Sequence, residues 1–235
     1  MLKLGVPSKG RLQNATISWF SERGIEISRS ALGREYRGSI SLPGAEIVMI
    51  SAAEVPRELA AGRLHLGVTG QDLVQEEIPQ WTEQLLEIEK LGFGHADLVV
   101  AVPSFWIDVN TMADFDGAAA AFRRTHGHRL RVATKYQYLV RSYFQSHGVA
   151  DYQLVDSQGA TEGTVKNLTA EAIADITSTG STLRDNHLKV LDDGPILKSQ
   201  ATLFLSRHAS WTRDTLATLH EVCRRIGAST PDIDV

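Results

Sequence analysis

The segment from Asp175 to Leu183 combines one carboxylate with a run of small hydroxyl residues and a glycine. The apolar residues before it predict a strand over Ile173–Thr177, and a short helix is predicted after the loop. Small residues let backbone N–H groups approach an anion closely, and serine and threonine hydroxyls add further donors. The pattern therefore favours a phosphate site whose loop residues are Thr177, Ser178, Thr179, Gly180, Ser181 and Thr182. The alternative is a helix-capping turn that binds nothing.

Asp175 repels a phosphate, so its carboxylate points to another part of the same ligand. A carboxylate beside a phosphate loop suits ribose hydroxyls or a Mg²⁺ ion. Glu162 belongs to a second loop, Gly159–Glu162, which follows the predicted strand Tyr152–Val155. Because open α/β sheets bind ligands at the carboxyl ends of their strands, Glu162 and Asp175 could face one magnesium–polyphosphate group together. Alternatively, Glu162 is an ordinary acid in the first turn of a helix.

Basic residues near the N-terminus offer contacts for further phosphates. Lys9 and Arg11 follow the predicted strand Lys3–Val6, and no acidic residue occurs before Glu22. Both cations could hold the phosphates of a nucleotide or a leaving pyrophosphate. Arg34 lies in a segment without clear periodicity and could swing onto a polyphosphate. The alternative for all three is a solvated surface cation.

A local positive charge also occurs in the middle of the chain, although the chain as a whole has 24 basic and 28 acidic residues and a formal charge of −4. Between residues 123 and 141 there are two histidines, no acid and six cations, namely Arg123, Arg124, Arg129, Arg131, Lys135 and Arg141. Such a field would steer a polyanionic substrate. The alternatives are a solvated helix face or a surface for an acidic protein partner. Nucleic acid is a weaker alternative, since stacking aromatics are not interleaved as in RNA-binding modules.

Several protein classes are excluded by what the sequence lacks. It has no P-loop, no strand-linked G-x-G-x-x-G and no G-x-S-x-G elbow. The one cysteine, Cys223, forbids an internal disulfide and fits a reducing cytoplasm. No apolar run approaches the ~20 residues of a membrane span, and no signal peptide is recognisable. We therefore expect a cytoplasmic protein that binds neither membrane nor nucleic acid.

The elements that must position these residues alternate between short apolar runs and helix-like stretches. This rhythm predicts an α/β protein with a largely parallel sheet and helices on its faces. No linker is visible, so we expect two lobes joined by strands that cross between them. The predicted first lobe spans residues 1–92 and 187–235, and the second spans residues 93–186. The cleft between the lobes is the expected ligand site.

Five segments together resemble one family, the ATP phosphoribosyltransferases in their short form. They are Ser8–Arg11, Gly67–Asp72, Arg131–Tyr136, Gly159–Glu162 and Asp175–Leu183, and the stretch from Glu162 to Leu183 is the most specific. The sequence departs from the family pattern at Leu168, where glycine is usual, and at Gln137-Tyr138.

The resemblance implies two lobes like those of type II periplasmic binding proteins, with the active site in the cleft. It implies an enzyme, a glycosyltransferase (pentosyltransferase), that joins phosphoribosyl pyrophosphate to N1 of the ATP adenine and releases pyrophosphate, the first step of histidine biosynthesis. The loop from Thr177 to Thr182 would then hold the 5′-phosphate, Asp175 the ribose hydroxyls, and Glu162 the ribose–Mg²⁺ side. Catalytic roles would fall to Arg11 and Arg34, and ATP contacts to Lys9, Arg11 and Asp72.

The resemblance further implies that Mg²⁺ enters with the substrate rather than in a site held by protein alone. Short forms work with a regulatory subunit similar to histidyl-tRNA synthetase, so we expect a homodimer within a hetero-oligomer. The main alternative is a non-catalytic two-lobed nucleotide- or solute-binding protein, because the same fold serves both activities.

Overall fold

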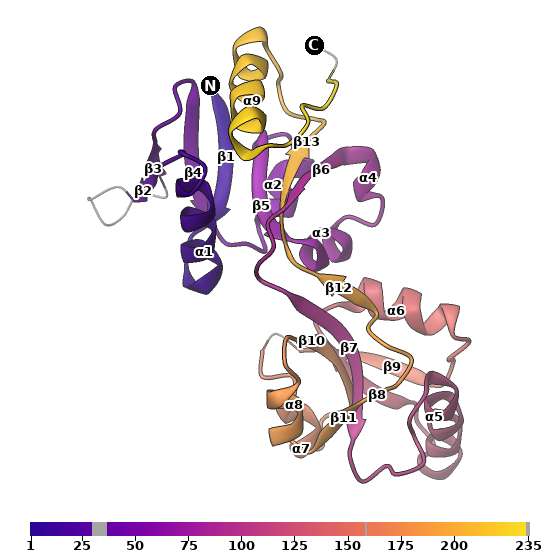
Figure 1. Ribbon diagram of the computed structural model, residues 1–235. Coiled ribbons are helices and arrows are strands. Elements are labelled where there is room, and N and C mark those ends of the chain that lie inside the picture. The colour runs from indigo at the N-terminus through magenta and orange to yellow at the C-terminus, as the bar shows by residue number, and fades with distance from the viewer. Residues whose placement is uncertain (30–36, 158, 234–235) are drawn as a thin grey trace. The chain divides into compact units, whose positions relative to one another are not determined.

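The chain divides into two α/β units in a computed structural model that describes residues 1–29, 37–157 and 159–233 (Figure 1). Unit 1 comprises Met1–Gly94 and Gln200–Val235, and unit 2 comprises His95–Ser199. Each unit has its own sheet and its own buried core. No helix in the described ranges is long and apolar enough to cross a membrane.

Unit 1 is built on a mixed sheet whose described strands follow the order β2-β3-β4-β1-β5-β13-β6. The central strands β4, β1 and β5 are parallel, and the outer strands are antiparallel to their neighbours. Parallel strands present their carboxyl ends at one edge, so the residues that follow β1, β4 and β5 meet there. The strand bounds are β1 (Leu2–Pro7), β2 (Ile27–Arg29), β3 (Arg37–Ile40), β4 (Ala45–Ile50), β5 (Leu66–Gly70), β6 (Leu85–Lys90) and β13 (Ala201–Ser206).

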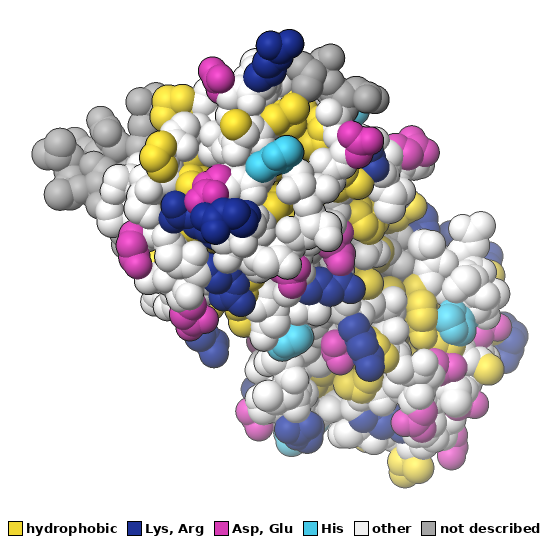
Figure 2. All heavy atoms as spheres, turned by 45° about the horizontal axis from the view of Figure 1, so that its top comes forward, with side chains coloured by type: hydrophobic (Ala, Val, Ile, Leu, Met, Phe, Trp, Pro, Cys, Tyr) yellow, Lys and Arg dark blue, Asp and Glu magenta, His cyan; other side chains and the backbone are white. Residues whose placement is uncertain are grey.

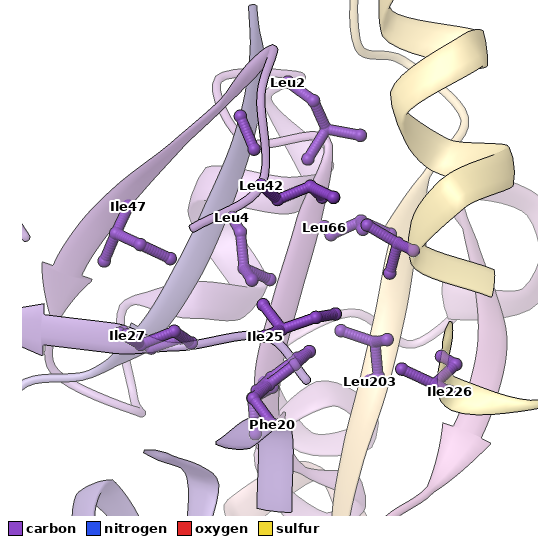
Figure 3. Close-up of a cluster of buried hydrophobic side chains, with 14 of the residues drawn as sticks. Leu2, Leu4, Phe20, Ile25, Ile27, Leu42, Ile47, Leu66, Leu203 and Ile226 are labelled. Carbon is purple, nitrogen blue, oxygen red and sulfur yellow. The ribbon is translucent and has the colours of Figure 1, made fainter. Parts of the chain in front are cut away.

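The core of unit 1 lies where α1 and α9 cover this sheet. Leu4 of β1 and Phe20 of α1 are almost fully buried there, with Leu203 of β13 and Ile226 of α9 packed into the same cluster (Figure 3). Burial of these side chains removes apolar area from water and holds the sheet rigid beneath its loops. The helices of unit 1 are α1 (Gly10–Ser21), α2 (Val55–Ala60), α3 (Gln71–Glu77), α4 (Trp81–Gln84) and α9 (Arg213–Ile226).

Unit 2 is built on a second mixed sheet with the order β11-β7-β10-β8-β9, and β12 also pairs with β7. The strands β10, β8 and β9 are parallel, whereas β7 is antiparallel to β10, β11 and β12. The strand bounds are β7 (Ala96–Pro103), β8 (Leu130–Thr134), β9 (Tyr152–Asp156), β10 (Ala172–Thr177), β11 (Leu188–Val190) and β12 (Leu197–Ser199). The helices are α5 (Met112–His126), α6 (Gln137–Ser146), α7 (Gly163–Lys166) and α8 (Ser181–Asp185).

The prediction of a largely parallel sheet was wrong, because each unit contains a mixed sheet. The β-α-β rhythm holds only for the central strands of each unit. Three short strands, β2, β3 and β12, carry too few residues for a clear alternating pattern and were missed. They and the returning strand β13 pair antiparallel, which needs no crossover helix.

The predicted return of the chain to the first lobe at residue 187 was too early. Leu188–Val190 and Leu197–Ser199 both pair with β7 and therefore belong to the second sheet. The chain returns to unit 1 only at Gln200. The sequence shows apolar runs there but not which strand each run pairs with.

Basic and acidic side chains are interspersed on the surface and form ion pairs. Pairs such as Arg57–Glu77 and Arg224–Glu221 are exposed, and the face shown in Figure 2 carries cationic and anionic side chains next to one another. Exposed pairs of this kind contribute little to stability.

His65 is a buried titratable residue of unit 1, and its two hydrogen bonds show that its ring is neutral. Its Nδ1 accepts the backbone N–H of Lys3 at 3.2 Å, and its Nε2 lies 3.2 Å from the carbonyl oxygen of Ser210. The ring also packs edge-to-face on Trp211, with 4.9 Å between centroids. Only the neutral ring protonated at Nε2 satisfies both bonds, and burial lowers the pKa of His65 below its usual 6.5.

We expect the free energy of unfolding to fall as the pH drops from 7.5 to 5.5. Because the pKa of His65 is lower in the folded chain, the unfolded chain binds more protons in this window, and acid favours unfolding. Urea unfolding of His65→Gln should show a weaker pH dependence than the parent, whereas His220→Gln, at an exposed position of α9, should match the parent. An unchanged pH dependence in His65→Gln would remove His65 from this role.

Candidate active site

Three loops of unit 2 meet at one edge of its sheet. The parallel strands β9, β8 and β10 run side by side, with Thr134 opposite Asp156 and Ala133 opposite Ile173. Their carboxyl ends therefore lie together, and the loops that start at Lys135, Ser157 and Ser178 leave the same edge. This is the edge where open α/β sheets bind ligands.

Hydroxyl groups of the loop after β10 form hydrogen bonds with the backbone of the same loop. The hydroxyl of Thr177 accepts the N–H of Gly180 at 2.8 Å, and the hydroxyl of Thr179 accepts the N–H of Ser181 at 3.3 Å. Gly180 has φ = 69°, the left-handed conformation that glycine adopts without cost. A Cβ at this position would also lie 2.9 Å from the guanidinium of Arg184.

The predicted phosphate residues lie together in this loop and face solvent. The side chains of Ser178, Thr179, Ser181 and Thr182 are exposed, and Thr177 and Gly180 are partly exposed. The hydroxyls of Thr179 and Ser181 form a hydrogen bond of 3.0 Å with each other, so one of them keeps its proton free for an anion and the other can exchange its partner for the anion. The arrangement offers several donors within a single turn, which is what a phosphate monoester requires.

Asp175 is half-buried near the end of β10, and its surroundings do not fully satisfy its charge. One carboxylate oxygen accepts the N–H of Ile176 at 2.8 Å. Burial raises the pKa of Asp175, and the charge of Glu162 raises it further, whereas the N–H of Ile176, the cation Lys135 and the hydroxyl of Thr161 lower it. The burial effect is the largest. A carboxylate in this state gains free energy from donors that a ligand brings.

Glu162 lies close enough to Asp175 for the two charges to interact. It precedes α7 as its N-terminal flanking residue and is partly exposed. The buried hydroxyl of Thr161 receives a hydrogen bond of 3.1 Å from Ser157, which ties this loop to the end of β9. Ala160 is held at φ = 49°, and such strain is retained where the surrounding structure requires that backbone path.

Lys135 also lies at this edge of the unit 2 sheet. The sequence alone placed it only in the basic run and not in the candidate site. Its ammonium lies 4.8 Å from the ring centroid of Tyr136 and interacts with the charge of Asp175. The available signal was its position directly after the strand Leu130–Thr134, the same relation that singled out Ser8–Arg11 and the loop after Asp175. Lys135 is exposed and is therefore accessible to a ligand.

A second group of candidate residues lies at the corresponding edge of the unit 1 sheet. Lys9 and Arg11 follow β1, and both are exposed without an ion pair to any described residue. Asp72 follows β5 in the first turn of α3 but is only 6% exposed. Its carboxylate is therefore part of the interior of unit 1, so a direct contact with a nucleotide has less support than for Lys9 and Arg11.

Arg34 lies outside the described residues. For the metal, the described residues contain no group of three or more His, Cys, Asp or Glu side chains suited to hold an ion. Asp175 and Glu162 could supply two carboxylates, which is the usual protein share when Mg²⁺ arrives with substrate phosphates. Two carboxylates therefore fit a Mg²⁺ ion that arrives bound to the phosphates of the substrate.

These observations define a two-unit α/β protein with a hydroxyl-rich loop and a carboxylate at one sheet edge and exposed cations at the edge of the other sheet. A family model described as ATP phosphoribosyltransferase (HisG) matches residues 51–228. A protein from Cereibacter sphaeroides named ATP phosphoribosyltransferase is 62% identical over 212 residues, which cover 90% of each chain. One of the same name from Rhodopseudomonas palustris is 51% identical, over 96% of this chain and 70% of that protein. The chain belongs to the ATP phosphoribosyltransferase family, as the resemblance predicted.

Solved structures agree in fold. One chain of the ATP phosphoribosyl transferase (HisG:HisZ) complex from Thermotoga maritima superposes with a TM-score of 0.72 at 21% identity, over 96% of this chain and 98% of that one. ArgBP from Thermotoga maritima superposes with a TM-score of 0.51 at 12% identity, over 96% and 89%. A substrate binding protein of an amino acid ABC transporter gives 0.50 at 11% identity, over 96% and 91%. The expected periplasmic-binding-protein-like fold is confirmed.

Leu168 is one of the positions at which the sequence departs from the expected family pattern. It has φ = 59° and an 80% exposed side chain. The backbone is left-handed at this point, so glycine would adopt it without strain.

Proposed function

We propose that this chain is a catalytic ATP phosphoribosyltransferase. It transfers the phosphoribosyl group of phosphoribosyl pyrophosphate to N1 of the ATP adenine and releases pyrophosphate, the first step of histidine biosynthesis. One observation carries the proposal: in a member of this family, a loop of exposed hydroxyls stands beside the half-buried carboxylate of Asp175. A sugar phosphate has the matching parts, a phosphate for the loop and hydroxyls for the carboxylate.

The loop and Asp175 orient the sugar. Thr179, Gly180, Ser181 and Thr182 would surround the 5′-phosphate with hydroxyl and backbone N–H donors. The ribose hydroxyls would donate to Asp175, which relieves the cost of burying its charge. Holding C1 of the ribose in line with the incoming adenine can supply roughly 7–11 kcal/mol of the barrier in favourable cases.

Bond exchange needs no general base. The neutral lone pair of adenine N1 forms the new bond to C1, and the C1–O bond breaks with its electrons moving to the pyrophosphate oxygen. No proton leaves N1 in this step. The remaining requirement is to stabilise the negative charge that develops on the leaving pyrophosphate oxygens, and cationic side chains can do this. This role suits Lys135 of unit 2 and three cations of unit 1, namely Lys9, Arg11 and Arg34.

Mg²⁺ is part of the proposal as an ion bound to the diphosphate of the sugar donor. When bound, it neutralises charge on the departing pyrophosphate. The contribution of this chain is the pair Glu162 and Asp175, which lie within electrostatic reach of each other at the sheet edge. Asp72 is proposed only to stiffen the start of α3 beneath the nucleotide, because it is buried.

We also propose that the chain works in the cytoplasm with a regulatory subunit similar to histidyl-tRNA synthetase, as a homodimer within a hetero-oligomer. The Thermotoga maritima complex, in which a HisG chain is joined to HisZ, supports a partner. The second candidate is a non-catalytic two-lobed binding protein, which the likeness to solute-binding folds leaves open.

One assay separates the two candidates. The chain is mixed with ATP, phosphoribosyl pyrophosphate and Mg²⁺, and the N1-linked adduct is followed by ultraviolet absorbance, with and without the regulatory subunit. Adduct formation that depends on all three components supports the enzyme. ATP that is bound and recovered unchanged under every condition would establish the binding protein instead.

Arg11→Gln should lower kcat at least tenfold and leave the affinity for phosphoribosyl pyrophosphate within twofold of the parent. Its guanidinium is exposed and unpaired among the described residues, so its proposed role is at the nucleotide or the leaving group. Arg207→Gln, at an exposed position of the same unit, is the matched control. Arg34→Ala should behave like Arg11→Gln. Unchanged turnover in steady-state kinetics would show that the residue concerned has no catalytic role.

A further inference from the structure

Half of the basic run in unit 2 is not used by the fold or by the proposed chemistry. Arg123 pairs with Asp151, Arg131 pairs with Glu171, and Lys135 lies over a tyrosine ring. The side chains of Arg124, Arg129 and Arg141 are exposed and make no ion pair or hydrogen bond with any described residue. Three arginines without a partner among the described residues, in a chain of net charge −4, form a local positive charge that attracts anions.

Two of these arginines line one cavity of about 620 Å³. Arg129 precedes β8, and Arg141 lies on α6. The rest of the lining comes from the end of α6, the turn after it and the start of β9, and comprises Gln145, Gly148, Val149, Ala150, Tyr152, Gln153 and Leu154. We refer to this feature as the arginine cavity. It lies toward the amino-terminal ends of β8 and β9, whereas the proposed active-site loops leave the carboxyl ends.

The shape of the arginine cavity follows the edge of a strand. Tyr152, Gln153 and Leu154 are consecutive, and successive side chains of a strand point to opposite faces. A hollow on one face of the sheet would be lined by alternate residues, so consecutive lining residues mean that the cavity runs along the strand's backbone. Among the described strands, β9 pairs only with β8 and forms the end of the sheet (Figure 1).

An end strand presents unpaired backbone N–H and C=O groups, and an extended segment can add to it. Here the exposed edge lies beside two free guanidinium groups, which favour carboxylates. Val149 and Leu154 add apolar side chains to the lining of the same cavity. A small anion would use the arginines alone and leave the strand edge unpaired.

We propose that the arginine cavity binds an extended acidic segment of a partner protein, which pairs with the free edge of β9 and places its carboxylates on Arg129 and Arg141. The occupant is thus a strand in which acidic and apolar side chains alternate. This inference does not depend on the proposed catalytic function, because none of these residues belongs to the active-site loops.

The test uses the full chain and a fluorescein-labelled peptide of alternating glutamate and valine, measured by fluorescence anisotropy at low salt. Saturable binding is expected, and the double variant R129E/R141E should weaken it at least tenfold. The control R124E changes an equally free arginine outside the cavity and should stay within twofold. Equal losses in both variants would indicate general attraction to the basic run and overturn the proposal.

A second peptide distinguishes strand pairing from charge attraction. Methylation of alternate backbone amides removes donors without changing the charge, and it should weaken binding at least fivefold. A lysine–valine peptide should not bind. If the methylated peptide binds as well as the parent, or if citrate or inorganic phosphate displaces the peptide at equal carboxylate or phosphate concentration, the cavity takes small anions and the proposal fails.

Two further measurements test whether R129E/R141E changes the oligomeric state or the fold of the chain. Analytical ultracentrifugation of the chain alone should give the same mass for the parent and R129E/R141E; a lower mass in the variant would identify a second copy of this chain as the occupant and overturn the partner proposal. Circular dichroism and the thermal midpoint should match the parent, because both arginines are exposed.

Discussion

Asp175→Asn should weaken the binding of phosphoribosyl pyrophosphate by two to three orders of magnitude. Each hydrogen bond to a charged group contributes about 1.5–3 kcal/mol, and the carboxylate can accept two from the ribose. The amide is isosteric but neutral, so it accepts more weakly and presents an NH₂ group to a donor. Titration calorimetry with phosphoribosyl pyrophosphate and Mg²⁺ measures the change directly.

The acid limb of the binding curve gives a second readout of the same residue. Burial raises the pKa of Asp175, so its ionised form, which binds, is lost as the pH falls toward that pKa. Affinity should therefore decrease on acidification in the parent and be nearly independent of this ionisation in Asp175→Asn. Asp185→Asn, at the exposed end of α8, is the matched control and should match the parent. Parent-like affinity and pH dependence in Asp175→Asn would end the assignment.

Gly180→Ala should weaken the same ligand by one to two orders of magnitude and leave ATP binding unchanged. A side chain at φ = 69° costs roughly 1–2 kcal/mol of strain. The new Cβ also lies 2.9 Å from the guanidinium of Arg184, which must move. The loop that carries the hydroxyls of Thr179 and Ser181 would then shift from the phosphate.

The control for backbone strain is Gly127→Ala. Gly127 ends α5 with φ = 73°, and a Cβ there meets nothing within 4 Å. Gly127→Ala should lower the free energy of unfolding in urea about as much as Gly180→Ala does, but it should leave the affinity for phosphoribosyl pyrophosphate unchanged. If the two variants weaken ligand binding equally, the effect of Gly180→Ala comes from lost stability rather than from the loop.

Much of the proposed site could be read from the sequence because its motifs are local. A strand that carries Asp175 near its end, a loop of hydroxyls and one glycine are contiguous, and the backbone of such a segment follows from its own residues. The motifs after β1 and β9 were recognised in the same way. Lys135 received no role because its value lies in its distance from Asp175, and residues 40 positions apart come together only through the pairing of β8 with β10.

Asp72 shows the opposite limit. In the sequence it is a carboxylate close to the carboxyl end of a strand, as Asp175 is. In the structure Asp72 is 6% exposed, whereas Asp175 is half-buried at an edge. Burial depends on which helices cover a position, and a local pattern does not contain that information.

The sequence by itself therefore determined the α/β class, the family and the loops that are proposed to bind phosphate, because propensity, turn residues and motif spacing act over a few neighbouring positions. Tertiary structure alone decided the mixed strand order, the return of the chain at Gln200, the environment of Asp175 and the arginine cavity beside β9. These features arise from contacts between residues distant along the chain, whose free energies depend on strand pairing and burial rather than on local sequence.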